Sequence, residues 1–189
     1  MLGNIRDIIQ TVRKIVKLFR KSPTKNDVLQ NNLRMQFSKE KALILDSKTR
    51  WNSLLTMLER FYEIGEFVKK TLYDIDESIM FVSQKDFALI YEIIYVLRLV
   101  KIAVEALCKS DSNLLAADVT IKFMLDELTK LNQTKLGNDL KEKIIIRFKE
   151  RRTVLSDVLQ LLHDPCSYDD DCENYGVFNI SSKTVLKKK

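Results

Sequence analysis

The sequence predicts a mainly α-helical protein, a bundle of several helices joined by short connections. The 189 residues contain only 4 glycines and 2 prolines, so the residues that usually form turns and end helices are rare. Several long stretches place apolar side chains three and four positions apart, which is the period of an amphipathic helix. With 46% hydrophobic residues, a chain of this length can bury one substantial core or two small ones.

The N-terminal region predicts two helices. The first covers about residues 4–21, and Ser22 and Pro23 end it. A second, thinner helix follows, with Thr24 as its cap and Asp27 three positions later as a variant of the capping box. The first helix is predicted from an apolar stripe with a period near 3.6, formed by Ile5, Ile8, Ile9, Val12, Ile15, Val16 and Phe19.

A short apolar run, residues 42–45, predicts the only strand of the chain. The run is too short for a helix, and Asp46 and Ser47 bound it. A lone strand leaves both edges unpaired, so the run is either coil or helix after all, or part of a sheet larger than this chain supplies. From Trp51 to about Tyr73 the apolar residues return to helical spacing, which predicts that a helix follows the strand within a few residues. We call this junction, residues 46–53, the corner.

The most apolar stretch predicts a long buried helix. Ser83 and Asp86 form a capping box in front of it, and the helix covers about residues 84–109. We expect Cys108 to be buried within it as a small hydrophobic side chain. The stretch is not expected to cross a membrane, because it carries four charges: Glu92, Arg98, Lys101 and Glu105.

Two further helices and an unstructured tail complete the chain. One helix covers about residues 115–131, and the last runs from about residue 138 to just before Pro165. Residues 166–189 lack a sustained apolar period and predict a disordered tail. In the first of these helices, four residues are expected to face the core: Val119, Phe123, Met124 and Leu128.

The residue types needed for catalysis or metal binding are not arranged in any known pattern. The three cysteines, Cys108, Cys166 and Cys172, are scattered and do not form a zinc spacing with His163, the only histidine. His163 lies at a predicted helix end, where interaction with the helix dipole explains it. We expect no catalytic residue, no metal site and no cofactor.

Two groups of residues could contact nucleic acid, and the net charge of +6 permits such a partner. On the first helix, Arg6, Gln10, Arg13, Lys17 and Arg20 lie close to one line on a helical wheel, either as a solvated face or as a row of cations for a phosphate backbone. Arg50 and Trp51 stand together at the corner. They could grip a phosphate and stack on a base, or Trp51 could anchor its helix in the core.

The corner also carries a family resemblance. Residues Asp46, Lys48, Thr49, Arg50, Trp51, Asn52 and Ser53, followed by Met57, Leu58 and Phe61, resemble the D-x-x-T-R-W-N-S…M-L-x-R stretch of hAT-superfamily DNA transposases. The resemblance covers about residues 5–165. It implies that residues 1–48 are the end of a ribonuclease-H-like core with two helices and one strand, that residues 49–165 are its helical insertion, and that residues 166–189 are the tail.

The resemblance also implies roles for individual residues. The matching Arg-Trp pair of the family lies near the active site and handles a flipped base, which assigns that role to Arg50 and Trp51. The catalytic carboxylates of the family, which would hold a divalent metal such as Mg²⁺, lie outside this stretch. Asp46 matches a non-catalytic position, so we expect a structural role for it.

We therefore expect a truncated or degenerate transposase-like protein of the transposable-element class, without self-contained DNA cleavage. It is expected to be intracellular, and nuclear if the resemblance holds, with no membrane or small-molecule partner. Residual nucleic-acid binding would use Arg50, Trp51, Arg6, Arg13, Lys17 and Arg20. The alternative is a structural helical module that docks a partner protein or forms a homo-oligomer.

Overall fold

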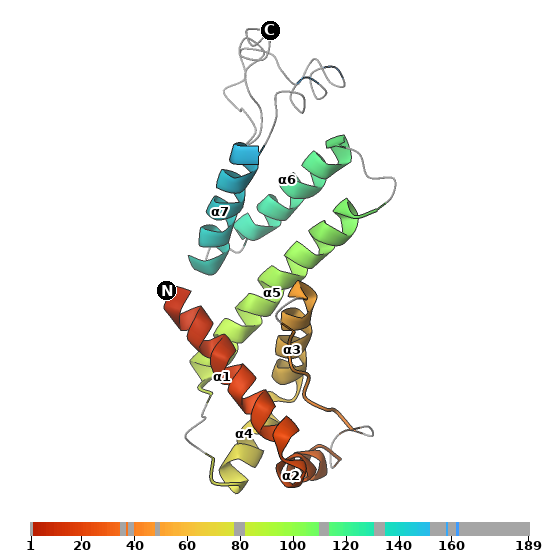
Figure 1. Cartoon of the computed structure of the whole chain (residues 1–189). Coiled ribbons are helices and arrows are strands. Elements are labelled where there is room, and N and C mark those ends of the chain that lie inside the picture. The colour runs from red at the N-terminus through yellow and green to blue at the C-terminus, as the bar shows by residue number, and fades with distance from the viewer. Residues whose placement is uncertain are drawn as a thin grey trace. The chain divides into compact units, whose positions relative to one another are not determined.

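The computed structural model of the chain describes residues 2–34, 37, 40–47, 50–77, 82–109, 114–130 and 135–151, together with residues 158 and 162. Within these residues it contains seven helices and no strand, which confirms the mainly α-helical fold class (Figure 1). The chain divides into two compact units, Met1–Arg98 and Leu99–Lys189, and each is described by itself. The expected divisions at residues 48 and 165 stay predictions.

The first unit is built from four helices and the beginning of a fifth. These are α1 (Leu2–Lys21), α2 (Pro23–Arg34), α3 (Trp51–Glu63), α4 (Gly65–Asp74) and the start of α5 (Gln84–Leu107). Helix α1 packs on α2 and α3, and α4 packs on the same two helices. The predicted stripe of α1 supplies much of the core, with five fully or almost fully buried side chains: Ile8, Val12, Ile15, Val16 and Phe19.

The start of α2 corrects the predicted cap. The helix begins at Pro23, and the residue in front of it, Ser22, supplies the capping oxygens. The backbone N–H of Lys25 donates to Ser22 Oγ over 3.4 Å, and that of Asn26 donates to the Ser22 carbonyl over 3.0 Å. Proline suits the first helical position because its φ is already helical and that position needs no N–H donor. Thr24 therefore lies inside the helix.

The predicted strand is not formed, since residues 40–47 are neither helix nor strand. A strand needs a neighbour for its backbone groups, and the described residues contain none. A side-chain amide takes that role instead. Gln30, 5% exposed, donates from Nε2 to the Lys41 carbonyl over 3.4 Å and accepts from the Lys41 N–H over 3.3 Å. The segment still enters the core through Leu43, which is 4% exposed.

The single helix predicted from Trp51 to Tyr73 is divided in two. Helix α3 ends at Glu63 and α4 begins at Gly65, with Ile64 between them in a non-helical conformation (φ −110°, ψ 16°). The break coincides with a close approach of Phe87, because a Cβ on Gly65 would lie only 2.3 Å from Phe87 Cε1. Glycine is therefore required here by the ring that packs against it.

The long helix α5 starts as predicted. The Ser83 N–H donates to Asp86 Oδ2 over 2.9 Å, and the Asp86 N–H donates to Ser83 Oγ over 3.2 Å, which confirms the capping box. The other end corrects a prediction, because Cys108 is exposed rather than buried. Cys108 follows Leu107, the last helical residue, and therefore lies beyond the apolar face of the helix.

The second unit contains α6 (Leu114–Lys130) and α7 (Lys135–Arg151), which pack against each other. Lys141 Nζ of α7 donates to Thr129 Oγ1 of α6 over 2.5 Å. Of the four residues predicted to face inward, Met124 and Leu128 are buried, but Val119 and Phe123 are 69% and 57% exposed. The buried stripe of α6 is shifted around the helix and consists of Ile121, Met124, Leu125 and Leu128.

The C-terminal predictions fall largely outside the described residues. Beyond Arg151 only residues 158 and 162 are described, so His163, Pro165 and the predicted tail at 166–189 lie outside them. Among the helices that are described, none is long and apolar enough to span a lipid bilayer.

Candidate nucleic-acid interface

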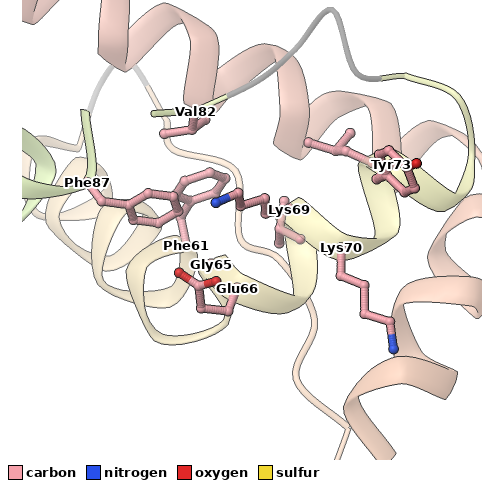
Figure 2. A pocket seen from close by; sticks show the side chains of 10 residues that line it. Phe61, Gly65, Glu66, Lys69, Lys70, Tyr73, Val82 and Phe87 are labelled. Carbon is pink, nitrogen blue, oxygen red and sulfur yellow. The ribbon is translucent and has the colours of Figure 1, made fainter. Parts of the chain in front are cut away.

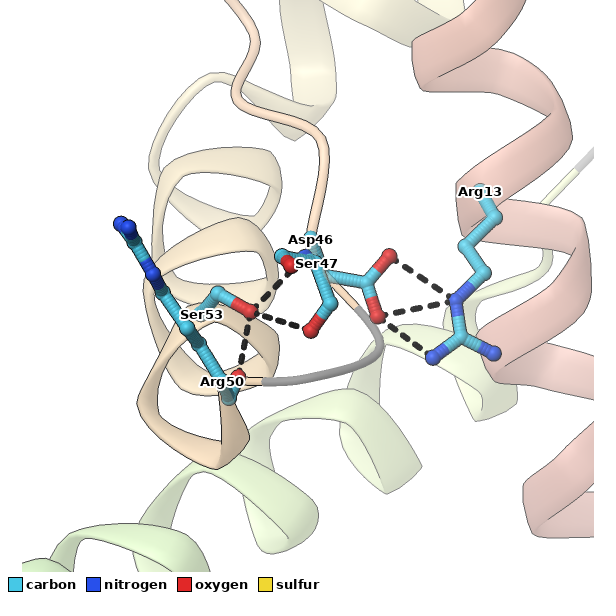
Figure 3. Close-up of polar contacts among 5 residues, drawn as sticks. All are labelled: Arg13, Asp46, Ser47, Arg50 and Ser53. Carbon is cyan, nitrogen blue, oxygen red and sulfur yellow. Dashed lines mark hydrogen bonds and ion pairs between the residues drawn. The ribbon is translucent and has the colours of Figure 1, made fainter.

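In the corner in front of α3, one hydroxyl group holds the described residues, 46–47 and 50–53, together. Ser53 Oγ accepts a hydrogen bond from the Ser47 N–H over 2.8 Å (Figure 3). The same oxygen lies 2.9 Å from the carbonyl oxygen of Ser47 and 2.5 Å from that of Arg50, so its single proton can be donated to either. The backbone adds a bond from the Arg50 N–H to the Ser47 carbonyl over 3.1 Å. These contacts fix the direction in which the chain enters α3.

The carboxylate of Asp46 is held by Arg13 from the middle of α1. Arg13 Nε lies 2.9 Å from Asp46 Oδ1 and 3.0 Å from Oδ2, and Nη2 lies 2.5 Å from Oδ2 (Figure 3). The side chain of Asp46 is 5% exposed and that of Arg13 is 33% exposed. This fork geometry is the one in which guanidinium binds carboxylate most strongly.

The electrostatics follow from that geometry. The hydrogen bonds from Arg13 lower the pKa of Asp46 below its usual value, although burial acts in the opposite direction. The charges of Arg13 and, more weakly, of Lys17 lower it further. The pKa of Arg13 is raised by the same hydrogen bonds. Both groups are therefore ionised near neutral pH, and the expected structural role of Asp46 agrees with its position.

This ion pair joins the corner in front of α3 to the polar side of α1. Asp46 belongs to the corner that leads to Arg50 and Trp51, whereas Arg13 and Lys17 belong to the polar side of α1. Asp46 accepts hydrogen bonds from Arg13, and the charge of Lys17 lowers its pKa. The Asp46 end of the corner therefore lies against the predicted row of cations on α1. No sequence signal indicated that Asp46 contacts α1.

The structure leaves most of the predicted cations exposed. Arg50 precedes α3 with extended backbone angles (φ −119°, ψ 101°), and its side chain points away from the Arg13–Asp46 pair (Figure 3). Trp51 is the first residue of α3, and its side chain lies outside the described part of the structure. Among the cations predicted to bind nucleic acid, four are exposed and have no ion-pair partner among the described residues: Arg6, Lys17, Arg20 and Arg50.

Arg13 differs from these residues because its guanidinium is already bound within the protein. It lies in the predicted row, but it serves to hold the corner on α1. Two exposed lysines of the same helix, Lys14 and Lys21, add charge that the helical-wheel argument did not include. Helical geometry places Arg6 and Arg20 about 21 Å apart along α1.

Metal ligands are not assembled in this region. Within the described residues, no group of three or more His, Cys, Asp or Glu side chains is placed to hold a metal ion. The acidic residue at the corner, Asp46, is engaged by Arg13.

A cavity of about 360 Å³ lies on another side of the first unit and was not predicted from the sequence. Phe61 and Phe87 lie at one end of it, with ring centroids 6.0 Å apart, and Tyr73 lies at the other end (Figure 2). Lys70 points away from the cavity, and Gly65 forms part of the wall (Figure 2). The lining is mainly apolar, so the cavity has little in common with the cationic surface of α1.

Comparison with known families gives one finding. The family model described as the ZBED1 RNase-like helical domain matches residues 1–96, and the match ends two residues before the last residue of the first compact unit, Arg98. Comparison with curated proteins and with solved structures gives no match. The matched range includes the whole cationic side of α1, the Asp46 corner and α3. The chain therefore belongs to the ZBED1 RNase-like helical domain family, a transposase-related family of hAT origin.

Proposed function

We propose that the first unit contacts nucleic acid through the cationic side of α1 and the adjoining corner, without cutting it. The observation that carries this proposal is the ion pair between Arg13 and Asp46, because it joins the segment that leads to Arg50 and Trp51 to the helix that carries the other predicted cations. The family membership supports the same reading, since transposases act on DNA.

The cationic surface suits the phosphate backbone rather than base edges. Its exposed charges, Arg6, Lys17, Arg20 and Arg50, are long side chains without internal ion-pair partners in the described structure. Such contacts position a nucleic acid but do not read its sequence. If all four contact phosphates of duplex DNA, the slope of log K against log salt is about −3.6, and affinity falls about 150-fold between 50 and 200 mM salt.

The corner supplies the second component, stacking. Trp51 begins α3 directly after Arg50, at the point that Ser53 and the backbone bonds fix. An indole that stacks on one base contributes about 1–3 kcal/mol and does not depend strongly on the base. We infer that Trp51 prefers single-stranded or distorted DNA, in which a base is available for stacking.

Binding without cleavage is the second part of the proposal. The carboxylate of the corner, Asp46, is bound by a bidentate guanidinium and is not available as a metal ligand. Purified protein with Mg²⁺ or Mn²⁺ should therefore leave a supercoiled plasmid intact, and metal-dependent nicking would contradict this part. That the chain is a truncated transposase stays a prediction, which frame-shifted catalytic-domain codons in the flanking genome would support.

Salt titrations of binding to labelled DNA test the contact. Lys17→Ala and Arg50→Ala should each reduce the salt slope by about 0.9, because each removes one released counterion. Trp51→Ala should weaken binding to single-stranded DNA by about 1–3 kcal/mol with the slope unchanged. The matched control is Lys122→Ala, which removes the same charge from an exposed site on α6 in the second unit.

Two outcomes of the titrations would contradict the proposed DNA contact. Undetectable binding at 20–50 mM salt (roughly the range in which such contacts are strongest) would refute the proposal. A slope that changes equally in Lys17→Ala and Lys122→Ala would show that only net charge matters. Quenching of Trp51 fluorescence by single-stranded DNA gives an independent reading, because it is the only tryptophan of the chain.

A further inference from the structure

A single residue separates the first two helices, and it is a serine that stands directly before a proline. Helix α1 ends at Lys21 and α2 begins at Pro23, so Ser22 is the one non-helical residue between them. Ser22 itself is partly exposed. The residues that surround it in the chain, Lys21, Pro23 and Thr24, are exposed. The junction therefore lies at the surface of the first unit.

The hydroxyl group of Ser22 is held weakly. Its oxygen accepts the N–H of Lys25 over 3.4 Å, which is long for a hydrogen bond between N–H and oxygen. The described residues provide this hydroxyl with no shorter hydrogen bond. In this contact the oxygen acts as an acceptor, and its proton takes no part. The hydroxyl can therefore be modified without the loss of a strong contact.

The sequence around this hydroxyl matches the substrates of one class of enzyme. Residues 22–25 read Ser-Pro-Thr-Lys. Proline-directed protein kinases modify a serine or threonine directly before proline, and a basic residue shortly after the proline favours them. Proline also disfavours the helical conformation of the residue before it, which leaves that residue extended. The chain contains only two prolines, and the other, Pro165, follows Asp164, so Ser22 is the only residue of the sequence in this setting.

We propose that Ser22 is a phosphorylation site and that its phosphate weakens the nucleic-acid contact of α1, the second part resting on the proposed function. A proline-directed kinase transfers the γ-phosphoryl group of ATP to Ser22 Oγ. A bond forms between Oγ and the γ-phosphorus, and the bond between that phosphorus and the oxygen bridging to the β-phosphate breaks. ADP leaves, and the hydroxyl proton passes to a base of the kinase.

The surroundings of Ser22 suit a phosphate group. Ser22 precedes the first turn of α2, where backbone N–H groups favour an anion, and that turn contains no acidic residue. Arg20 and Lys21, in the last turn of α1, are exposed cations directly before it. The carboxylate of Glu77 is paired with Lys25, whose Nζ lies 2.5 Å from Oε1. A phosphate at this junction is therefore held by cations and N–H groups, and α2 stays helical.

The same phosphate competes with DNA for the end of α1. It adds a charge of about −1.5 to −2 at neutral pH. Arg20, two positions away, is one of the four exposed cations of the proposed contact, and it pairs with the new phosphate instead of with the DNA backbone. Losing one phosphate contact lowers the salt slope by about 0.9, which corresponds to about eightfold weaker binding at about 0.1 M salt.

Kinase treatment of the full chain, followed by mass spectrometry, tests the modification. A purified proline-directed kinase with ATP and Mg²⁺ should add a single phosphate, on Ser22. Ser22→Ala should abolish it because the hydroxyl is gone, and Pro23→Ala should abolish it although the hydroxyl remains. The matched control is Thr24→Ala, which removes the neighbouring exposed hydroxyl and should be phosphorylated like the wild type. Circular dichroism checks that each variant keeps the helical fold.

Salt titrations with labelled duplex DNA test the consequence. The phosphorylated protein should bind about eightfold more weakly than the untreated protein at about 0.1 M salt, with a slope smaller by about 0.9. Kinase-treated Ser22→Ala should bind like its untreated form. The control for net charge is Lys122→Glu, which also makes the chain more negative by two charges, at an exposed site on α6, and should leave the affinity unchanged.

The two parts of the proposal fail in different ways. A wild type that gains no phosphate, a phosphate mapped to another residue, or unchanged phosphorylation of Pro23→Ala would overturn the site. These measurements contain no nucleic acid, so their failure leaves the DNA proposal unaffected. Unchanged DNA affinity after phosphorylation, or equal weakening by Lys122→Glu, would overturn the regulatory part. A wild type that binds no DNA would refute the proposed function and the regulatory part together, while mass spectrometry still decides the site.

Discussion

Replacing Arg13 by alanine should destabilise the first unit more than replacing its partner Asp46 by asparagine. The asymmetry follows from the burial of the two side chains. Asp46 is 5% exposed, so without Arg13 its carboxylate stays out of water and unpaired. Arg13 is 33% exposed, so without the carboxylate its guanidinium can turn toward solvent.

The magnitudes follow from these exposures. Removing one partner of a fully buried ion pair costs about 3–5 kcal/mol, and partial access of water to this pair places Arg13→Ala at the low end, about 3 kcal/mol. An asparagine in place of Asp46 would keep the shape of the side chain and one acceptor for Arg13, so Asp46→Asn should cost about 1 kcal/mol. The double variant should cost less than the sum of the two because the residues are in direct contact.

Urea unfolding followed by tryptophan fluorescence measures these changes in the full chain. Trp51 is the only tryptophan and lies in the first unit, so its signal reports the unfolding of that unit. Lys14→Ala is the matched control, because Lys14 is an exposed cation of the same helix without an ion-pair partner in the described structure. It should change stability by less than about 0.5 kcal/mol.

Two results would refute this reasoning. Equal destabilisation by Arg13→Ala and Asp46→Asn would show that the buried carboxylate is not the dominant cost. An effect of Arg13→Ala no larger than that of Lys14→Ala would show that the ion pair does not hold the corner on α1. In that case the proposed DNA contact would lose the ion pair on which it rests.

Three further predictions concern the first unit. The pKa of Asp46 is lowered in the folded state. Its contribution to the free energy of unfolding is therefore complete above the unfolded pKa of about 3.9 and is lost as the pH falls through the folded-state pKa. The stability gap between wild type and Arg13→Ala, from urea midpoints across pH, should therefore narrow below about pH 4, and a constant gap would contradict it. Gly65→Ala should cost about 1–3 kcal/mol by overpacking against the ring of Phe87, 2.3 Å from the new Cβ, and Phe87→Leu should recover part of that loss in the urea midpoint. Ser83→Ala removes the capping box of α5 and should cost about 1 kcal/mol by the same assay, whereas an unchanged midpoint would show that the box is dispensable.

The elements that were predicted correctly depend on short-range signals. The apolar stripe of α1 and the box of Ser83 and Asp86 lie within a few turns of chain, and the structure confirms both. The errors arose where a distant residue decides the outcome. The break between α3 and α4 coincides with the packing of Phe87 against Gly65. In the 40–47 segment, the side chain of Gln30 bonds the backbone of Lys41 in place of a neighbouring strand.

Burial was also predicted less well than helicity. Val119 and Phe123 share helical spacing with Met124 and Leu128, so periodicity alone allowed either face to be the inner one. Packing of α6 against α7 selects the stripe that contains Ile121 and leaves Phe123 exposed.

The amino-acid sequence by itself determined the helical class, the basic character of α1 and the corner motif from Asp46 to Ser53, because each is written in neighbouring residues. The tertiary structure decided which charges are available. Arg13 and Asp46 are 33 positions apart, and only the packing of α1 on α3 brings the guanidinium to the carboxylate. A charge can be counted from the sequence, but whether it faces water or a partner depends on the burial and distances that folding creates.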